Sequence, residues 1–194
     1  LKAAQRHGVE IPHLCYTDGL RPDGNCRACV VEIAGERTLA PSCCRAPTPG
    51  MKVQAASPRA RKSQQMVVEM LLSDMPDMGY RWNDEQKNTP ELIAGSAYPE
   101  SARGQFDSKT PESTGQHGEL SEWATRLGVA VRPALKALRR QQPAPDLSHP
   151  AMAVNLDACI QCNRCVRACR EEQVNDVIGY ALRGADSKIV FDLD

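Results

Sequence analysis

The sequence predicts an α+β fold built from short strands and a few helices. Segments 30–33, 38–40 and 51–55 carry apolar and β-branched residues, and they predict a hairpin followed by a third strand. Ser57-Pro58 is a favourable N-cap and N1 pair for a helix that we expect to end near residue 73. The 194 residues suffice for one or two small domains, and only 4% of them are aromatic, which predicts modest hydrophobic cores.

The composition argues against a nucleic-acid partner and a membrane span, and the cysteines indicate a reducing compartment. Lys plus Arg and Asp plus Glu number 24 each, so no basic excess indicates a nucleic-acid partner. No apolar run approaches the length of a membrane span. The nine cysteines form two groups, with none between Cys44 and Cys159. Thiols grouped at ligand spacings indicate metal ligands in a reducing compartment, and we expect the cytoplasm.

The second cysteine group has the spacing C-x2-C-x2-C-x3-C, which is typical of the bacterial ferredoxin run for a [4Fe–4S] cluster. We expect Cys159, Cys162 and Cys165 to bind three irons of one cluster. Cys169 is expected to serve the other cluster of a two-cluster module. Disulfides fit such tight spacing poorly, and zinc usually takes two separated cysteine pairs.

The first cysteine group has the spacing C-x10-C-x2-C-x13-C, which suits the four thiolates of a [2Fe–2S] cluster. The expected ligands are Cys15, Cys26, Cys29 and Cys43. Gly19 and Gly24 would let the backbone curl closely around inorganic sulfide. A zinc site made of the same four thiolates is the alternative.

Two residues near this group have simpler expected roles. Cys44 could replace Cys43 as a ligand, but we expect it to be a free thiol that is buried or half-buried. His13 is expected to pack against the ligand loop or to donate a hydrogen bond, because four cysteines already suffice.

The remaining segments form the ends and the connector of the fold. We expect the helix that begins at Ser57 to bury Val67, Met70 and Leu71 on one apolar face. The polar, turn-rich stretch 83–118 predicts a long surface loop or linker. Further helices are expected over 119–127 and 133–140, and the end of a helix over 1–9. Arg139-Arg140 would complement the dipole of the helix over 133–140. A strand is expected over 152–156, and a hairpin of 177–182 with 188–193.

Arg164, Arg167 and Arg170 surround the second cysteine group. One interpretation is a solvated helix face. The other is that these cations stabilise the reduced state of a nearby cluster and raise its potential. The sequence favours neither interpretation.

The first cysteine group resembles the N-terminal ferredoxin domain of the complex I large iron–sulfur subunit, and the matching domain of NAD-linked hydrogenases and formate dehydrogenases. The residues that carry the resemblance are Ile11-Pro12, Cys15-Tyr16, Gly24-Asn25-Cys26-Arg27, Cys29, Val31-Glu32 and Ser42-Cys43. The resemblance implies a β-grasp fold, whose first hairpin would lie before Leu1. In the complex I and hydrogenase relatives the next helix leads into a His–Cys motif for a further [4Fe–4S] cluster. Met75 stands where that histidine is expected and no cysteine follows until Cys159, so we expect that cluster to be absent.

Segment 149–179 resembles the α subunit of soluble NAD-dependent formate dehydrogenase. This resemblance implies an oxidoreductase whose later domains hold a molybdenum or tungsten molybdopterin and oxidise formate. It also implies a second [4Fe–4S] cluster outside this segment, and partners that comprise the rest of the α subunit and diaphorase-type subunits binding flavin and NAD. Both ends of the chain look truncated, so we expect a fragment.

We therefore expect three parts: a [2Fe–2S] domain over 1–56, a connector over 57–150, and the first half of a two-cluster [4Fe–4S] ferredoxin-like domain over 151–194. The expected function is one-electron relay between formate oxidation and NAD reduction, with no catalytic residue in this segment. One alternative is the same relay in an NAD-linked hydrogenase or complex I relative. Another, of a different class, is a zinc-stabilised interaction module.

Overall fold

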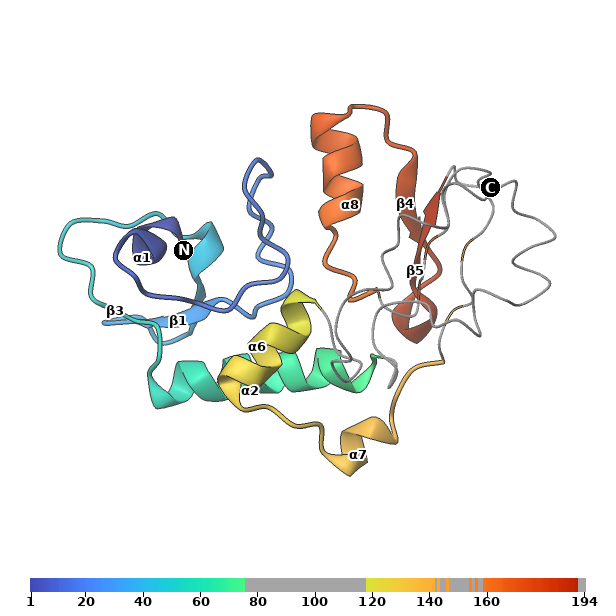
Figure 1. The fold of residues 1–194 in the computed structure, drawn as a ribbon. Helices are drawn as coiled ribbons and strands as arrows, with labels where there is room; N and C mark the ends of the chain where they lie inside the picture. The colour runs from blue at the N-terminus through green and yellow to red at the C-terminus, as the bar shows by residue number, and fades with distance from the viewer. Residues whose placement is uncertain are drawn as a thin grey trace, which may run out of the picture. The chain divides into compact units, whose positions relative to one another are not determined.

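The structure is a computed structural model that describes residues 1–75, 118–141, 143, 146, 154, 156 and 159–191. The chain divides into two compact units, whose elements Figure 1 labels. The first comprises Leu1–Asp74, Glu119–Arg139 and Cys162–Asp176, and the second comprises Met75–Gly118, Arg140–Gln161 and Val177–Asp194. None of the described helices is long and apolar enough to cross a membrane.

A small antiparallel sheet organises the first unit. Its central strand β1 (Val30–Ile33) pairs with β2 (Ala40–Pro41) on one side and with β3 (Val53–Gln54) on the other. The register places Val31 opposite Ala40, and Ile33 opposite Val53. These pairings confirm the predicted hairpin and third strand. The outer strands are shorter than the predicted 38–40 and 51–55, and a 3-10 turn, η1 (Ser42–Cys44), follows β2 directly.

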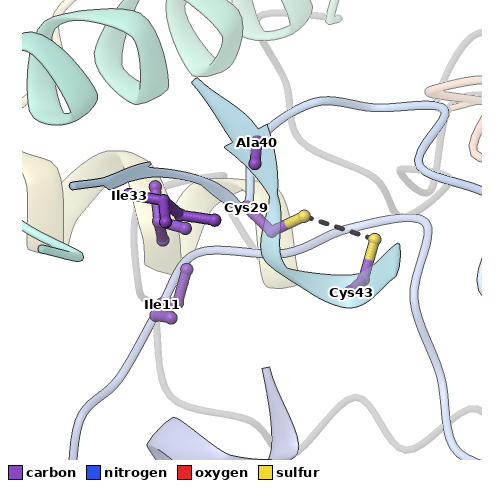
Figure 2. Packing of buried hydrophobic residues seen from close by; sticks show 6 residues of the cluster. Ile11, Cys29, Ile33, Ala40 and Cys43 are labelled. Carbon is purple, nitrogen blue, oxygen red and sulfur yellow. Dashed lines mark hydrogen bonds between the residues drawn. The ribbon is translucent and has the colours of Figure 1, made fainter. Parts of the chain in front are cut away.

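The apolar side chains of this sheet form a core that includes two of the predicted ligands. Alternate residues of a strand face the same side, so Cys29, Val31 and Ile33 point into one core. Figure 2 shows how they gather with residues from the neighbouring segments. The buried members of the cluster are Ile11, Cys29, Val31, Ile33, Ala40 and Cys43.

Helix α2 (Pro58–Ser73) begins as the sequence predicts. The Ser57 hydroxyl accepts a hydrogen bond from the Ala60 N–H at 3.2 Å, and Pro58 occupies the first helical position. The predicted buried face was wrong: Met70 is exposed, and Val67 and Leu71 are only half-buried. The side chains at four-residue spacing are buried instead, namely Ala60, Gln64, Val68 and Leu72.

One buried residue of this face, a glutamine, is polar and has its hydrogen-bond partners in the sheet. Gln64 is 2% exposed, and its side-chain Nε2 donates to the carbonyl of Val30 at 2.9 Å and to that of Ala55 at 3.1 Å. The amide thereby satisfies two backbone acceptors at the sheet and attaches the helix to β1. A buried polar group with both partners present costs little, whereas an unpartnered one is expensive.

The other helices of the first unit agree only partly with the sequence. Helix α6 (Glu119–Leu127) confirms the helix predicted over 119–127. In the structure it lies beside α2 (Figure 1). Helix α1 (Lys2–Arg6) ends before Gly8, whose φ of 72° suits a C-terminal cap. The helix predicted over 133–140 is wrong in length: α7 spans Pro133–Lys136, and Leu138 beyond it is 78% exposed. Without a buried contact for Leu138, no packing energy extends the helix to the two arginines.

The last segments carry the second cysteine group and a hairpin. Helix α8 (Arg164–Arg167) and the π-helical turn η2 (Ala168–Glu172) belong to the first unit. In the second unit, β4 (Ile178–Ala181) pairs with β5 (Lys188–Phe191) around the 3-10 turn η3 (Gly184–Asp186), which confirms the predicted hairpin. The strand predicted over 152–156 is represented among the described residues by a bridge of Val154 to Asp146. The stretch predicted as a linker over 83–118 lies outside the described residues, apart from Gly118.

We expect Gln64→Leu to lower the free energy of unfolding by about 1–3 kcal/mol, because the carbonyls of the buried Val30 and the half-buried Ala55 lose their donor. Urea denaturation checks this value. Lys62→Leu, on the exposed face of the same helix, is the matched control and should change stability by less than about 0.5 kcal/mol. Equal effects of the two substitutions would show that the Gln64 bridge contributes nothing specific.

A second polar contact ties α2 to the segment before α7. The buried Glu69 carboxylate accepts from the Arg132 guanidinium at 2.7 and 3.0 Å, and from the Arg132 backbone N–H at 3.0 Å. Hydrogen bonding to Arg132 holds the pKa of Glu69 below its usual range. A lowered pKa in the folded state means that the carboxylate stabilises the fold at neutral pH. This contribution is lost as the pH falls through the folded-state value.

Glu69→Gln should therefore lower the urea midpoint at neutral pH, and the difference from the unmodified protein should shrink below about pH 4. Denaturation midpoints of both proteins across this range test the prediction. Glu122→Gln, an exposed glutamate on α6, should leave the midpoint unchanged throughout. A Glu69→Gln difference that is constant with pH would contradict the argument.

Candidate metal centre

The sheet register brings Cys29 and Cys43 together. Cys29 directly precedes β1, and Cys43 lies in the turn that directly follows β2. Because Val30 pairs with Pro41, the residues on either side of this pair converge, and the Ser42 N–H donates to the Cys29 carbonyl at 3.0 Å. The two sulfur atoms lie 3.4 Å apart, as the dashed line in Figure 2 marks. This distance is far longer than a disulfide bond, and both thiols are free.

The other two predicted ligands meet in the loop before β1. The Cys15 N–H points to the sulfur of Cys26 and the Cys26 N–H points to the sulfur of Cys15, each at 3.4 Å. The Cys15 thiol also interacts with that of Cys43, which joins the two pairs into one set. The structure thus brings together all four predicted ligands of the first group. Cys15 and Cys29 are each 1% exposed, so the set lies largely away from water.

The electrostatics of this set follow from thiols sharing protons at close range. Hydrogen bonds from Cys26 and Cys43 lower the pKa of Cys15, and an interaction with Cys43 lowers the pKa of Cys29. Contacts with Cys15 and Cys29 raise the pKa values of Cys26 and Cys43, and burial raises them further. A bound metal would deprotonate all four.

The backbone around these sulfurs supplies hydrogen-bond donors. Among the backbone groups, the Asn25 N–H interacts with the Cys15 sulfur, and the Ala28 N–H interacts with that of Cys26. Gly24 and Arg27 adopt positive φ values of 64° and 59°, which curl the loop around the thiols. For Arg27 this conformation is strained, and such strain is common at binding sites. Four thiols in two pairs, with amides directed at sulfur, fit a [2Fe–2S] cluster.

Residues near the set have modest roles. The prediction that Cys44 is buried or half-buried was wrong: η1 turns Ser42 and Cys43 inward and leaves Cys44 exposed, with its sulfur 3.5 Å from that of Cys43. His13 Nδ1 lies 2.9 Å from the Ile11 carbonyl, and its ring packs near Tyr16 and Trp123, in keeping with the prediction. Within the described residues, no group of three or more His, Cys, Asp or Glu is arranged to hold one metal ion.

The structure divides the second cysteine group between the units. Cys159 belongs to the second unit, whereas Cys162, Cys165 and Cys169 belong to the first. Within the second unit, the Gln161 N–H points to the sulfur of Cys159 at 3.4 Å. Within the first unit, Cys169 is 5% exposed and its thiol donates to the Asn175 side chain at 2.8 Å. The expected [4Fe–4S] ligand set therefore stays a prediction.

The three arginines of this segment differ strongly. Arg164 forms a bidentate pair with Glu119, at 3.0 and 2.5 Å, and Arg170 pairs with Asp176 at 2.9 Å. Hydrogen bonding to Glu119, and to Cys162 more weakly, raises the pKa of Arg164. Arg167 is buried and donates to the carbonyls of Cys15 and Arg21. The interpretation of all three as one solvated face was therefore wrong for Arg167. No local sequence signal could identify its partner, which lies 152 residues earlier.

Comparison with known proteins supports the assignment of the first group. Residues 1–58 match the family described as the 2Fe-2S iron-sulfur cluster binding domain. The chain is 28% identical over 190 residues to a subunit of the NADH-quinone oxidoreductase of Rhizobium meliloti, covering 97% of this chain and 19% of that protein. It is 29% identical over 189 residues to the NADP-reducing hydrogenase subunit HndD of Solidesulfovibrio fructosivorans, covering 95% and 27%.

The chain spans about a fifth to a quarter of the length of these curated relatives. A solved structure of an NAD+-reducing [NiFe]-hydrogenase in the H2-reduced state is similar in fold, with a TM-score of 0.66 at 24% identity. That similarity covers 98% of this chain and 67% of the hydrogenase chain. Residues 1–58 are thus similar to 2Fe–2S cluster-binding domains, and the relatives from Rhizobium and Solidesulfovibrio are oxidoreductase subunits.

The tight loop at Gly24 generates a prediction. A Cβ at this residue would lie 2.9 Å from the sulfur of Cys44, and its φ of +64° disfavours any L side chain. We expect Gly24→Ala to lower the free energy of unfolding by about 1–2 kcal/mol from the backbone alone, and further from the contact. Urea denaturation measures the loss.

Gly50→Ala is the matched control, because its φ of +77° is similar and no atom lies within 4 Å of its Cβ. The excess loss in Gly24→Ala should disappear in the double variant Gly24→Ala/Cys44→Ala. An excess that persists without the Cys44 sulfur would refute the contact.

Proposed function

We propose that this chain is an iron–sulfur electron-transfer segment of an NAD(P)-linked oxidoreductase, of the type found in NADH-quinone oxidoreductases and NAD(P)-reducing hydrogenases. The observation that carries the proposal is the convergence of four thiols at the edge of one small sheet, with Cys29 and Cys43 3.4 Å apart. The match of residues 1–58 to a 2Fe–2S domain supports the same function.

In this proposal Cys15, Cys26, Cys29 and Cys43 hold a [2Fe–2S] cluster, which supplies one-electron chemistry when bound. The chain's own residues do the rest. The sheet fixes the spacing of the thiols, and the surrounding core excludes water from Cys15 and Cys29. Backbone N–H groups donate to the sulfurs and thereby tune the potential. No proton transfer or nucleophile is required.

The second cysteine group is proposed to bind three irons of a [4Fe–4S] cluster through Cys159, Cys162 and Cys165, with Cys169 serving the other cluster of a two-cluster module. The support is the ligand spacing and the similarity of nearly the whole chain to a relative that is named as an iron–sulfur protein of NADH dehydrogenase. We retain the division into parts 1–56, 57–150 and 151–194 as part of this proposal. A reducing compartment, the cytoplasm, and partner subunits that bind flavin and NAD(P) are proposed on the same basis.

A formate dehydrogenase α subunit, with a molybdopterin domain beyond this segment, is the second candidate. It is favoured by the resemblance of segment 149–179, and by Met75 in place of the histidine expected in complex I relatives. The similarity to NADH-quinone oxidoreductase and hydrogenase subunits favours the first candidate. Neither candidate changes the roles of the cysteines.

The adjacent cysteines at 43 and 44 allow a sharp test of the proposal. Cys43→Ser should lower the iron and sulfide bound at the [2Fe–2S] site by more than about tenfold, because a ligand contributes at least as much as the residues that support it. Cys44→Ser, one residue away and exposed, should load normally. Electron paramagnetic resonance of the anaerobically reconstituted, dithionite-reduced chain measures both.

The reduced protein should give a rhombic signal that survives to higher temperature, lost in Cys43→Ser. A faster-relaxing signal seen only near helium temperature should persist in Cys43→Ser and vanish in Cys165→Ser. A colourless, zinc-loaded, spin-silent protein would overturn the proposal and leave the zinc-stabilised interaction module.

A further inference from the structure

Arg167 makes long-range contacts to the loop that carries the first cysteine group, as its neighbours Asn163 and Glu171 also do. It lies on α8 between Cys165 and Cys169, yet it is only 5% exposed. Its guanidinium donates to two backbone carbonyls of the loop that carries the first cysteine group, those of Cys15 and Arg21. The two partners precede it by 152 and 146 residues. One side chain therefore joins the segments that carry the two cysteine groups, within the first unit.

The charge of this guanidinium is poorly balanced by the protein. Its two acceptors are neutral carbonyls, and its one ion-pair contact among the described residues is with the Asp23 carboxylate, 3.9 Å from Nε. Within the same part of the chain, Nε has no hydrogen-bond partner although it is buried. Asp23 is also shared, because it accepts from the Asn163 amide at 3.3 Å. A buried cation with so little compensation is costly unless an anion lies nearby.

The neighbouring arginines show the ordinary alternative. Arg164 and Arg170 each reach a carboxylate at hydrogen-bond distance, on Glu119 and Asp176 respectively. Arg170 is also largely exposed, with 59% of its side chain accessible, so its charge is screened by water. Burial and neutral acceptors therefore distinguish Arg167 from the other two.

The first cysteine group can supply the missing anion. Four thiolates with two irons and two sulfides carry net negative charge, and reduction adds one further negative charge. The Arg167 guanidinium reaches the carbonyl of Cys15, whose side chain is one of the four thiols and is 1% exposed. A buried cation beside Cys15 stabilises the reduced cluster more than the oxidised cluster, because its attraction to the cluster grows with the added electron.

We propose that Arg167 is a positioning residue that fastens the ligand loop of the first cluster to the helix bearing Cys165 and Cys169, and that its buried charge raises the reduction potential of the first cluster. The inference rests on the proposed function, since it requires the cluster to be bound. Arg fits this role better than Lys, because its planar fork can serve two carbonyls at once.

The test is a redox titration of the rhombic [2Fe–2S] signal in the full chain, reconstituted anaerobically. Arg167→Met should disfavour reduction by about tenfold, which is a fall of about 59 mV for a one-electron couple. Arg170→Met, three residues further along, removes an equal but exposed charge and should leave the potential unchanged. An Arg167→Met protein that loads its cluster with an unchanged potential would overturn the inference.

Arg167→Lys keeps the positive charge but loses the double hydrogen bond to the Cys15 and Arg21 carbonyls. It also provides a test if the Arg167→Met protein does not bind the cluster. It should stay within about threefold of the unmodified reduction equilibrium, because it keeps the cation. Hydrogen exchange of amides 15–26 should speed up about tenfold, because lysine cannot hold both carbonyls. Unchanged exchange in Arg167→Lys would refute the bridge. If the unmodified chain binds no cluster at all, the proposed function fails, which is distinct from equal potentials in loaded proteins.

Discussion

The pairing of β1 with β2 is the constraint on which the rest of the first unit depends. Its register sets Val31 opposite Ala40 and brings the flanking Cys29 and Cys43 within 3.4 Å. A slip by one residue would turn Val31 and Ile33 out of the core and separate the two sulfurs, because side chains alternate along a strand. The same hydrophobic burial that selects the register therefore also builds half of the metal centre.

This shared packing links metal binding to folding. Cys29 and Cys43 belong to the buried cluster with Ile11, Val31 and Ile33, so two of the proposed ligands are also core residues. With so few aromatic residues in the chain, ligation can contribute stability that packing does not supply. Helix α2 closes the arrangement through Gln64, whose amide holds the Val30 carbonyl directly beside Cys29. Substitution of Gln64 on α2 should therefore also affect the position of Cys29.

The sequence predicts features that are local and misses those that depend on partners far along the chain. The strands, the Ser57 cap and the first cysteine group follow from patterns within a few tens of residues. The buried face of α2 was misjudged because hydrophobicity alone ranks Met70 above Gln64 as a core residue. Gln64 is buried nevertheless, because two backbone carbonyls at the sheet accept hydrogen bonds from its amide. The exposure of Cys44 depends on the direction of a 3-10 turn, which spacing does not encode.

Arg167 illustrates the general difficulty with buried charge. By composition it is indistinguishable from Arg164 and Arg170, and only the fold decides which of the three leaves water. Burying a cation against neutral carbonyls costs stability. Such an arrangement is expected where a nearby anion offsets the cost, or where the cation holds two segments in a fixed position. A one-electron relay needs both, since transfer depends on the separation of its carriers and on their relative potentials. In the first unit, one guanidinium spans a contact between segments that the chain itself separates by about 150 residues.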